Sequence, residues 1–213
     1  MLQLRDTLSG EKRAFVPIAD EVLLYVCGIT PYSEAHLGHA LFSIVFDVLR
    51  RYLGWRGYAV RHIQNFTDID DKLIERSRET GRSVSELAAE NTEAYLAQIE
   101  RLNVLPATAY PRATEEIPRI VSFIEGLIGK GFAYESGGDV YYRVRRKSDY
   151  GKLSKRDIDD LRSVARVDPG ELKEDPVDFA LWKGAKPSEP SWPSPWGKGR
   201  PGWHIECSAM AMG

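Results

Sequence analysis

The sequence predicts an α/β fold that begins with a parallel sheet and continues into a smaller inserted α+β unit. Residues 1–66 contain, in order, a strand, a loop, a helix and a strand, which is the repeating unit of a parallel α/β sheet. Residues 114–144 instead predict a helix followed by a hairpin. The 213 residues are 43% hydrophobic and 28% charged, a globular balance that excludes general disorder.

The parallel sheet is predicted from two apolar segments. Residues 22–27 are continuously apolar and end at Gly28, as expected of a central strand buried on both faces. Apolar residues then recur at helical spacing over residues 41–52, which predicts a helix with one wide apolar face. Residues 58–66 follow as the second strand.

Polar residues, glycine and proline mark where the remaining predicted elements start and end. A second helix is expected to begin near Thr67 or Asp68, and Ser83 with Glu86 matches a capping box for the helix after it. We expect the chain to divide into residues 1–110 for the sheet, 111–190 for the insertion and 191–213 for a return to the sheet. The segment around Cys207 is expected to be extended.

Length, charge and cysteine content exclude several classes of protein. The longest apolar run is far shorter than the ~20 residues that span a bilayer, and the N-terminus carries no secretory signal. We therefore exclude membrane and secreted proteins and expect a cytoplasmic one, in which Cys27 and Cys207 stay reduced. A net charge of −2 excludes a general basic field for nucleic acid and leaves only a local patch.

His36 and His39, separated by Leu37 and Gly38, lie where the first predicted strand's loop enters the first helix. Helix N-termini bind phosphate, glycine permits close approach of a nucleotide, and imidazoles donate hydrogen bonds to phosphate oxygens. The alternative is a pair of surface histidines that cap a helix. The residues alone leave both interpretations open.

Three further clusters have a chemical and a plainer interpretation. Cys27 and Cys207 could share a metal, although zinc takes four ligands, and composition alone favours two buried apolar thiols. The carboxylates of residues 68, 70 and 71 could bind Mg²⁺, but capping of a helix is favoured. A basic cluster could meet a phosphate backbone or be a solvated face; it comprises Arg143, Arg145, Arg146, Lys147, Lys152, Lys155 and Arg156.

Taken together, seven phrases in the same order resemble the N-terminal part of a cysteinyl-tRNA synthetase, a class I aminoacyl-tRNA synthetase. They are Tyr25-Val-Cys-Gly-Ile-Thr-Pro-Tyr, His36-Leu-Gly-His-Ala, Phe46-Asp-Val-Leu-Arg-Arg-Tyr-Leu, Asn65-Phe-Thr-Asp-Ile-Asp-Asp-Lys, Gly151-Lys-Leu-Ser-Lys-Arg-Asp-Ile, Asp178-Phe-Ala-Leu-Trp-Lys and Pro201-Gly-Trp-His-Ile-Glu-Cys-Ser-Ala-Met. The resemblance implies a Rossmann-type catalytic domain in residues 1–110 and 191–213, split by a connective insertion at 111–190.

The resemblance also implies an activity and its site. The family joins L-cysteine to ATP, with Mg²⁺, as cysteinyl-adenylate and transfers it to tRNA(Cys), and a monomer is expected. His36 and His39 match the catalytic histidines that stabilise the α-phosphate, and Thr30 and Gly38 belong to the same ATP site. Cys27 and Cys207 match two of four zinc ligands. The amino-acid pocket is matched by Cys27, Thr67 and Trp203.

The chain departs from the family in its extent. The family's other two zinc ligands, its Lys-Met-Ser-Lys-Ser loop and its anticodon-binding region follow the part matched here. We therefore expect an amino-terminal fragment that is inactive alone. Two alternatives stay open: the cysteine ligase of mycothiol synthesis, which shares these phrases, and a non-catalytic paralogue fragment that binds nucleotide or tRNA.

Overall fold

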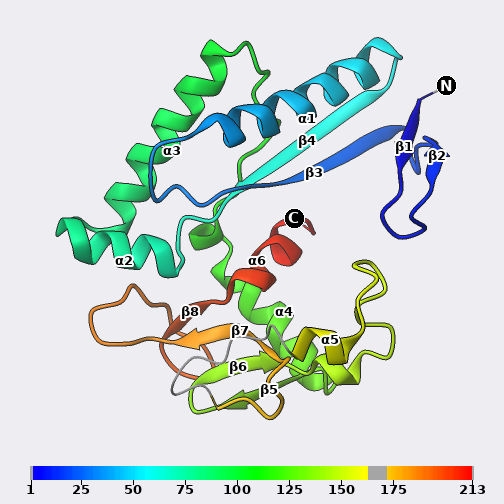
Figure 1. The fold of residues 1–213 in the computed structure, drawn as a ribbon. Coiled ribbons are helices and arrows are strands. Elements are labelled where there is room, and N and C mark those ends of the chain that lie inside the picture. The colour runs from blue at the N-terminus through cyan, green and yellow to red at the C-terminus, as the bar shows by residue number, and fades with distance from the viewer. Residues whose placement is uncertain (1, 163–171, 213) are drawn as a thin grey trace.

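The computed structural model describes residues 2–162 and 172–212, which form a small antiparallel pair, β1 with β2, and two larger units (Figure 1). A parallel pair of strands lies with α1 and α3, and a four-stranded antiparallel sheet lies with α4. The elements are β1 (Gln3–Arg5), β2 (Lys12–Ala14), β3 (Glu21–Ile29), α1 (Leu37–Trp55), β4 (Ala59–Phe66), α2 (Asp71–Thr80), α3 (Val84–Arg101), η1 (Ala113–Glu115), α4 (Ile117–Gly129), β5 (Ala133–Ser136), β6 (Asp139–Tyr142), η2 (Val144–Arg146), α5 (Ile158–Arg162), β7 (Phe179–Gly184), β8 (Gly199–Pro201) and α6 (Trp203–Met210).

The predicted parallel sheet is confirmed. β3 and β4 pair in parallel from Glu21 opposite Ala59 to Ile29 opposite Phe66, with a register shift between Val26 and Ile29. Residues 109–112 run parallel to β4 through two isolated bridges. Phe66 and Ile29 are buried against two residues of α3, Tyr95 and Ile99.

The expectation that β3 is buried on both faces is wrong for the described chain. Leu23 is 72% exposed, and within residues 2–162 and 172–212 β3 pairs with β4 alone. The predicted helix is confirmed as α1, but much of its apolar face also lies in solvent, including Leu41 and Val48. Both findings have one physical reason: no described element packs on that side of β3 and α1.

The second sheet is antiparallel, with strand order β5-β6-β7-β8. The predicted hairpin is confirmed, because Ala133 pairs with Tyr142 and Ser136 with Asp139. Buried residues of α4 and α6 pack on the sheet around Trp182. β8 belongs to this sheet, and the three expected domain limits stay predictions.

The segment that carries Cys207 is helical, so the expectation of extended backbone there is wrong. Pro201 ends β8 and Gly202 is the N-cap of α6. A Cβ on Gly202 would lie 2.1 Å from the carbonyl oxygen of Ala180, so only glycine permits this close packing against β7. α6 then buries residues at helical spacing, and Ile205 and Ala209 enter the core of the antiparallel sheet.

The helix expected near Thr67 or Asp68 begins later. The Thr67 backbone N–H donates to the Ile29 carbonyl, which continues the contact with β3. Asp70 is the N-cap of α2, where its carboxylate accepts from the Leu73 backbone N–H at 2.9 Å. The capping box at Ser83, which begins α3, is confirmed.

Candidate thiol and nucleotide site

Cys27 and Cys207 meet although 180 residues separate them. Cys27 lies near the carboxyl end of β3 and Cys207 lies on α6, and their Sγ atoms are 3.4 Å apart. The hydrogen bond between the two sulphurs lowers the pKa of the Cys207 thiol to about 6 and, together with burial, raises that of Cys27. The two thiols therefore titrate as a pair, in which Cys207 loses its proton before Cys27 does.

The thiol pair fits two positions of a tetrahedral zinc site. Two thiolates on one zinc ion lie roughly 4 Å apart, close to the observed separation. Among the described residues there is no group of three histidine, cysteine or acidic side chains that could hold a metal. His204 packs its ring 4.6 Å from that of Phe179, and Glu206 accepts from Thr67. Two further ligands would have to come from elsewhere.

Asn65, at the end of β4, holds the backbone beside the thiols. Its side chain is buried, and Oδ1 accepts from the Gly28 backbone N–H at 2.9 Å and from the Tyr25 hydroxyl at 3.0 Å. A Cβ on Gly28 would lie only 1.6 Å from the Asn65 carbonyl oxygen, so glycine is required beside Cys27. The sequence does not single out Asn65, because the same strand also carries Arg61, His62 and Gln64.

Thr67 and Glu206 form a buried pair next to Cys207. The Thr67 hydroxyl donates to Oε2 of Glu206 at 2.9 Å, and Glu206 is 1% exposed. Burial raises the pKa of Glu206 to about 9, so this carboxyl group is neutral at pH 7. The sequence placed Thr67 in the pocket and offered Glu206 only as a candidate metal ligand near Cys207.

A cavity of about 530 Å³ lies between the start of α2, the strands β7 and β8, and the start of α6. Two of the predicted site residues, Thr30 and Trp203, line it together with Glu206. Thr67 does not line this cavity directly and reaches it through its hydrogen bond to Glu206. Four of the predicted residues are thus brought together by α6. Trp203 and Cys207 lie on this helix, Cys27 contacts Cys207, and Thr67 donates to Glu206 of the same helix.

His36 and His39 lie together at the start of α1. Their rings stack with centroids 4.0 Å apart. Nδ1 of His36 accepts from the Gly38 N–H at 3.0 Å, and Nδ1 of His39 accepts from the His36 N–H at 3.3 Å. Both neutral rings therefore carry their proton on Nε2, which is left to donate. Burial lowers the pKa of His39, which favours this neutral form.

The helix-capping interpretation of the histidines is correct, and it is compatible with phosphate binding. Capping uses Nδ1 of each ring, whereas Nε2 has no hydrogen-bond partner among the described residues. A Cβ on Gly38 would lie 2.8 Å from the His36 ring, so glycine keeps that ring in its capping position. The pair lines an open cavity of about 670 Å³ with Tyr95 and Arg101.

The acidic cluster does not form a metal site in the described chain. Asp68 accepts from the Thr114 backbone and hydroxyl, Asp70 caps α2, and Asp71 pairs with Lys183. Each carboxylate therefore faces a different partner, and the capping interpretation is confirmed for Asp70.

The basic cluster is largely neutralised by nearby acids. Arg143 pairs with Glu174 at 2.7 Å, and Arg145 pairs with both Asp159 and Asp175. Lys147 and Lys152 pair with Asp149, and Lys155 donates to the Leu8 carbonyl. This pairing favours a solvated face over a phosphate-binding patch.

Comparison with known proteins gives consistent matches. Residues 14–213 match the family of tRNA synthetases class I (C) catalytic domain. The chain is 56% identical over 212 residues to a cysteine–tRNA ligase of Dehalococcoides mccartyi, covering 99% of this chain and 46% of that protein. It is 56% identical to one of Trichodesmium erythraeum, covering 99% and 45%. The chain thus spans about half the length of these relatives.

A solved structure supports the fold. Mycobacterium tuberculosis methionyl-tRNA synthetase in complex with methionyl-adenylate has a TM-score of 0.50 and 22% identity over 58% of this chain and 25% of that one. None of the helices in the described part combines the length and apolar character needed to cross a membrane. The predicted class I catalytic fold with a parallel sheet is confirmed, and the chain belongs to the catalytic-domain family of class I (C) tRNA synthetases.

Proposed function

We propose that the chain is the part of a cysteine–tRNA ligase that binds cysteine and activates it with ATP and Mg²⁺ for transfer to tRNA(Cys). The observation that carries this proposal is the pair of thiols 3.4 Å apart, next to a cavity lined by Thr30 and Trp203. The relatives named above favour tRNA over the amino sugar of a mycothiol-type ligase. The protein would act in the cytoplasm as a monomer.

Cys27 and Cys207 would hold zinc through two thiolates, with the remaining ligands outside the described residues. Bound zinc would stabilise the substrate thiol as a thiolate, which distinguishes cysteine from serine by the softness of the ligand. A pocket that used size alone would gain only about 1–3 kcal/mol. Asn65 would keep the two cysteines in place through Gly28 and Tyr25.

Trp203 would cover the amino acid in its cavity, and Thr67 would support that pocket through Glu206. His36 and His39 would donate from Nε2 to the α-phosphate while the cysteine carboxylate attacks it. Their Nδ1 atoms are already held by backbone N–H groups, so the donors are fixed before charge develops.

The test is cysteine-dependent ATP–pyrophosphate exchange by the full-length gene product, with serine as the competing amino acid. His36→Ala and His39→Ala should each slow exchange by about 10²–10³, the cost of losing one preorganised donor, and leave zinc content unchanged. Cys27→Ala should instead lose zinc and raise the cysteine requirement. Equal use of serine, or histidine variants that lose zinc but exchange normally, would contradict the assignment.

A further inference from the structure

Two positively charged side chains lie next to each other on adjacent strands of the antiparallel sheet, and one carboxylate contacts both. Lys183 on β7 and Arg200 on β8 are direct cross-strand partners, an arrangement that is destabilising by itself. Asp71, in the first turn of α2, pairs with both, and its Oδ2 lies 2.9 Å from Lys183 Nζ. The carboxylate that bridges this strand pair therefore comes from a helix outside the sheet.

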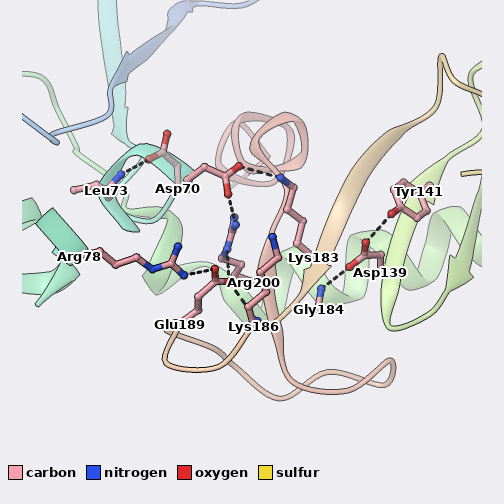
Figure 2. A network of polar contacts seen from close by, with 11 residues as sticks. Asp70, Leu73, Arg78, Asp139, Tyr141, Lys183, Gly184, Lys186, Glu189 and Arg200 are labelled. Atoms are coloured by element: carbon pink, nitrogen blue, oxygen red, sulfur yellow. Dashed lines mark hydrogen bonds and ion pairs between the residues drawn. The ribbon is translucent and has the colours of Figure 1, made fainter. Parts of the chain in front are cut away.

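A second ion pair holds the other end of the same helix (Figure 2). Arg78, in the last turn of α2, pairs with Glu189 at 2.9 Å, and Glu189 lies 3.8 Å from Nε of Arg200. The side chains of Arg200 and Glu189 are only 6% and 5% exposed. The buried guanidinium of Arg200 therefore depends on its two carboxylate partners, Glu189 and the 68% exposed Asp71, because little water reaches Arg200 itself.

This ionic network joins the two walls of the cavity described above. Asp71 and Arg200 both line it but come from different elements. Asp71 is on α2, which follows Thr67, whereas Arg200 is on β8, which precedes Trp203. The link from Arg200 to Trp203 has little freedom, since a Cβ on Gly202 would already meet Ala180. The distance between α2 and β8 therefore sets the position of Trp203.

We propose that Asp71 is a positioning residue: its bridge to Lys183 and Arg200 fixes Trp203 over the cavity and thereby sets the affinity for the amino-acid substrate. The proposal rests on the proposed function. Burial acts to raise the pKa of Asp71, but the hydrogen bond from Lys183 and the charge of Arg200 lower it overall, which keeps the bridge charged at neutral pH.

The test uses the full-length gene product and pyrophosphate exchange. Asp71→Asn should raise the KM for cysteine about tenfold and change kcat less than about twofold, because positioning affects binding more than chemistry. Asp71→Glu should restore KM to within about threefold. The matched control is Glu79→Gln, which removes an exposed ion pair with Arg76 on the same helix and should leave both parameters unchanged.

A double variant separates positioning from a general loss of contacts. In Asp71→Asn no carboxylate lies between Lys183 and Arg200, so the two cations repel each other. Adding Lys183→Gln removes that repulsion and should lower the KM below that of Asp71→Asn alone. Additive worsening, or an Asp71→Asn enzyme with wild-type KM or with kcat and KM affected alike, would overturn the proposal. If Asp71→Asn fails to fold, Lys183→Gln alone should raise the KM by a smaller factor than tenfold, since Asp71 still holds Arg200, and an unchanged KM would then overturn the proposal.

A measurement without substrate distinguishes this proposal from the proposed function. Amide hydrogen exchange of residues 199–203 should be faster in Asp71→Asn than in Glu79→Gln or wild type, because β8 loses its anchor to α2. Unchanged exchange there would refute the bridge. A wild-type protein without cysteine-dependent exchange would refute the proposed function, whatever the hydrogen-exchange result.

Discussion

Replacing Asn65 by alanine removes one acceptor that serves two donors beside the thiol pair. Oδ1 accepts from the Gly28 N–H at 2.9 Å and the Tyr25 hydroxyl at 3.0 Å. A buried donor without an acceptor costs about 1–3 kcal/mol, and both donors here are only partly buried, so each belongs near the lower end of that range. We therefore expect Asn65→Ala to lower the free energy of unfolding by about 2–3 kcal/mol.

The assay is urea unfolding of the chain followed by tryptophan fluorescence. Asn91→Ala is the matched control, because Asn91 makes one side-chain bond, to the Leu87 carbonyl within α3, and alanine favours a helix. We expect that control to change the free energy of unfolding by less than about 1 kcal/mol. Equal losses in the two variants would refute the view that Asn65 organises this site.

Asn65→Asp separates geometry from charge. It keeps both acceptor bonds, so most of the stability should remain. It also puts a negative charge where Oδ1 now lies 3.9 Å from Cys207 Sγ, which disfavours a thiolate there. The thiols should then react more slowly with a disulfide reagent at pH 7 than in wild type. An unchanged rate would show that the amide acts only by holding the backbone, and a faster one would refute the charge argument.

Two further predictions concern the supporting structure. Burial lowers the pKa of His62 below its ordinary 6.5. The contribution of the neutral ring to the free energy of unfolding is therefore fully present above pH 6.5 and is lost as the pH falls below that value. His62→Leu should reduce this loss between pH 7 and 5, measured by urea midpoints. Gly202→Ala should destabilise by about 2 kcal/mol or more, because its Cβ would overlap the Ala180 carbonyl. Gly54→Ala in α1, where the Cβ meets nothing within 4 Å, should instead stabilise by about 0.5–1 kcal/mol, and thermal melts of both variants check the pair.

Secondary-structure elements that depend on neighbouring residues alone were predictable from the sequence. The apolar run before Gly28, the periodic face of α1 and the capping box at Ser83 each depend on residues a few positions apart. α6 was not predictable in this way. It is short, and its start depends on Gly202 packing against Ala180 on β7, a contact that appears only when the sheet has formed.

The same distinction between local causes and contacts among distant elements applies to the site. The two histidines lie in the first turn of one helix, so local spacing already offered both a capping and a phosphate-binding interpretation. The approach of Cys27 to Cys207 was expected from the family resemblance, whereas composition favoured two unrelated thiols. Asn65 and Asp71 received no role beside the thiols and the cavity, because the partners that define their roles lie on other elements.

α6 explains how a site of this kind can depend on both sheets at once. Ile205 and Ala209 bury it in the core of the antiparallel sheet, whereas Met210 enters the core between α2 and α3. The same helix carries Cys207 to Cys27 on β3. Any shift of the antiparallel sheet relative to β3 must therefore change the separation of the two sulphurs. The bridge from Asp71 to the buried Arg200 opposes that shift, so the cavity and the thiol pair are held by one set of contacts.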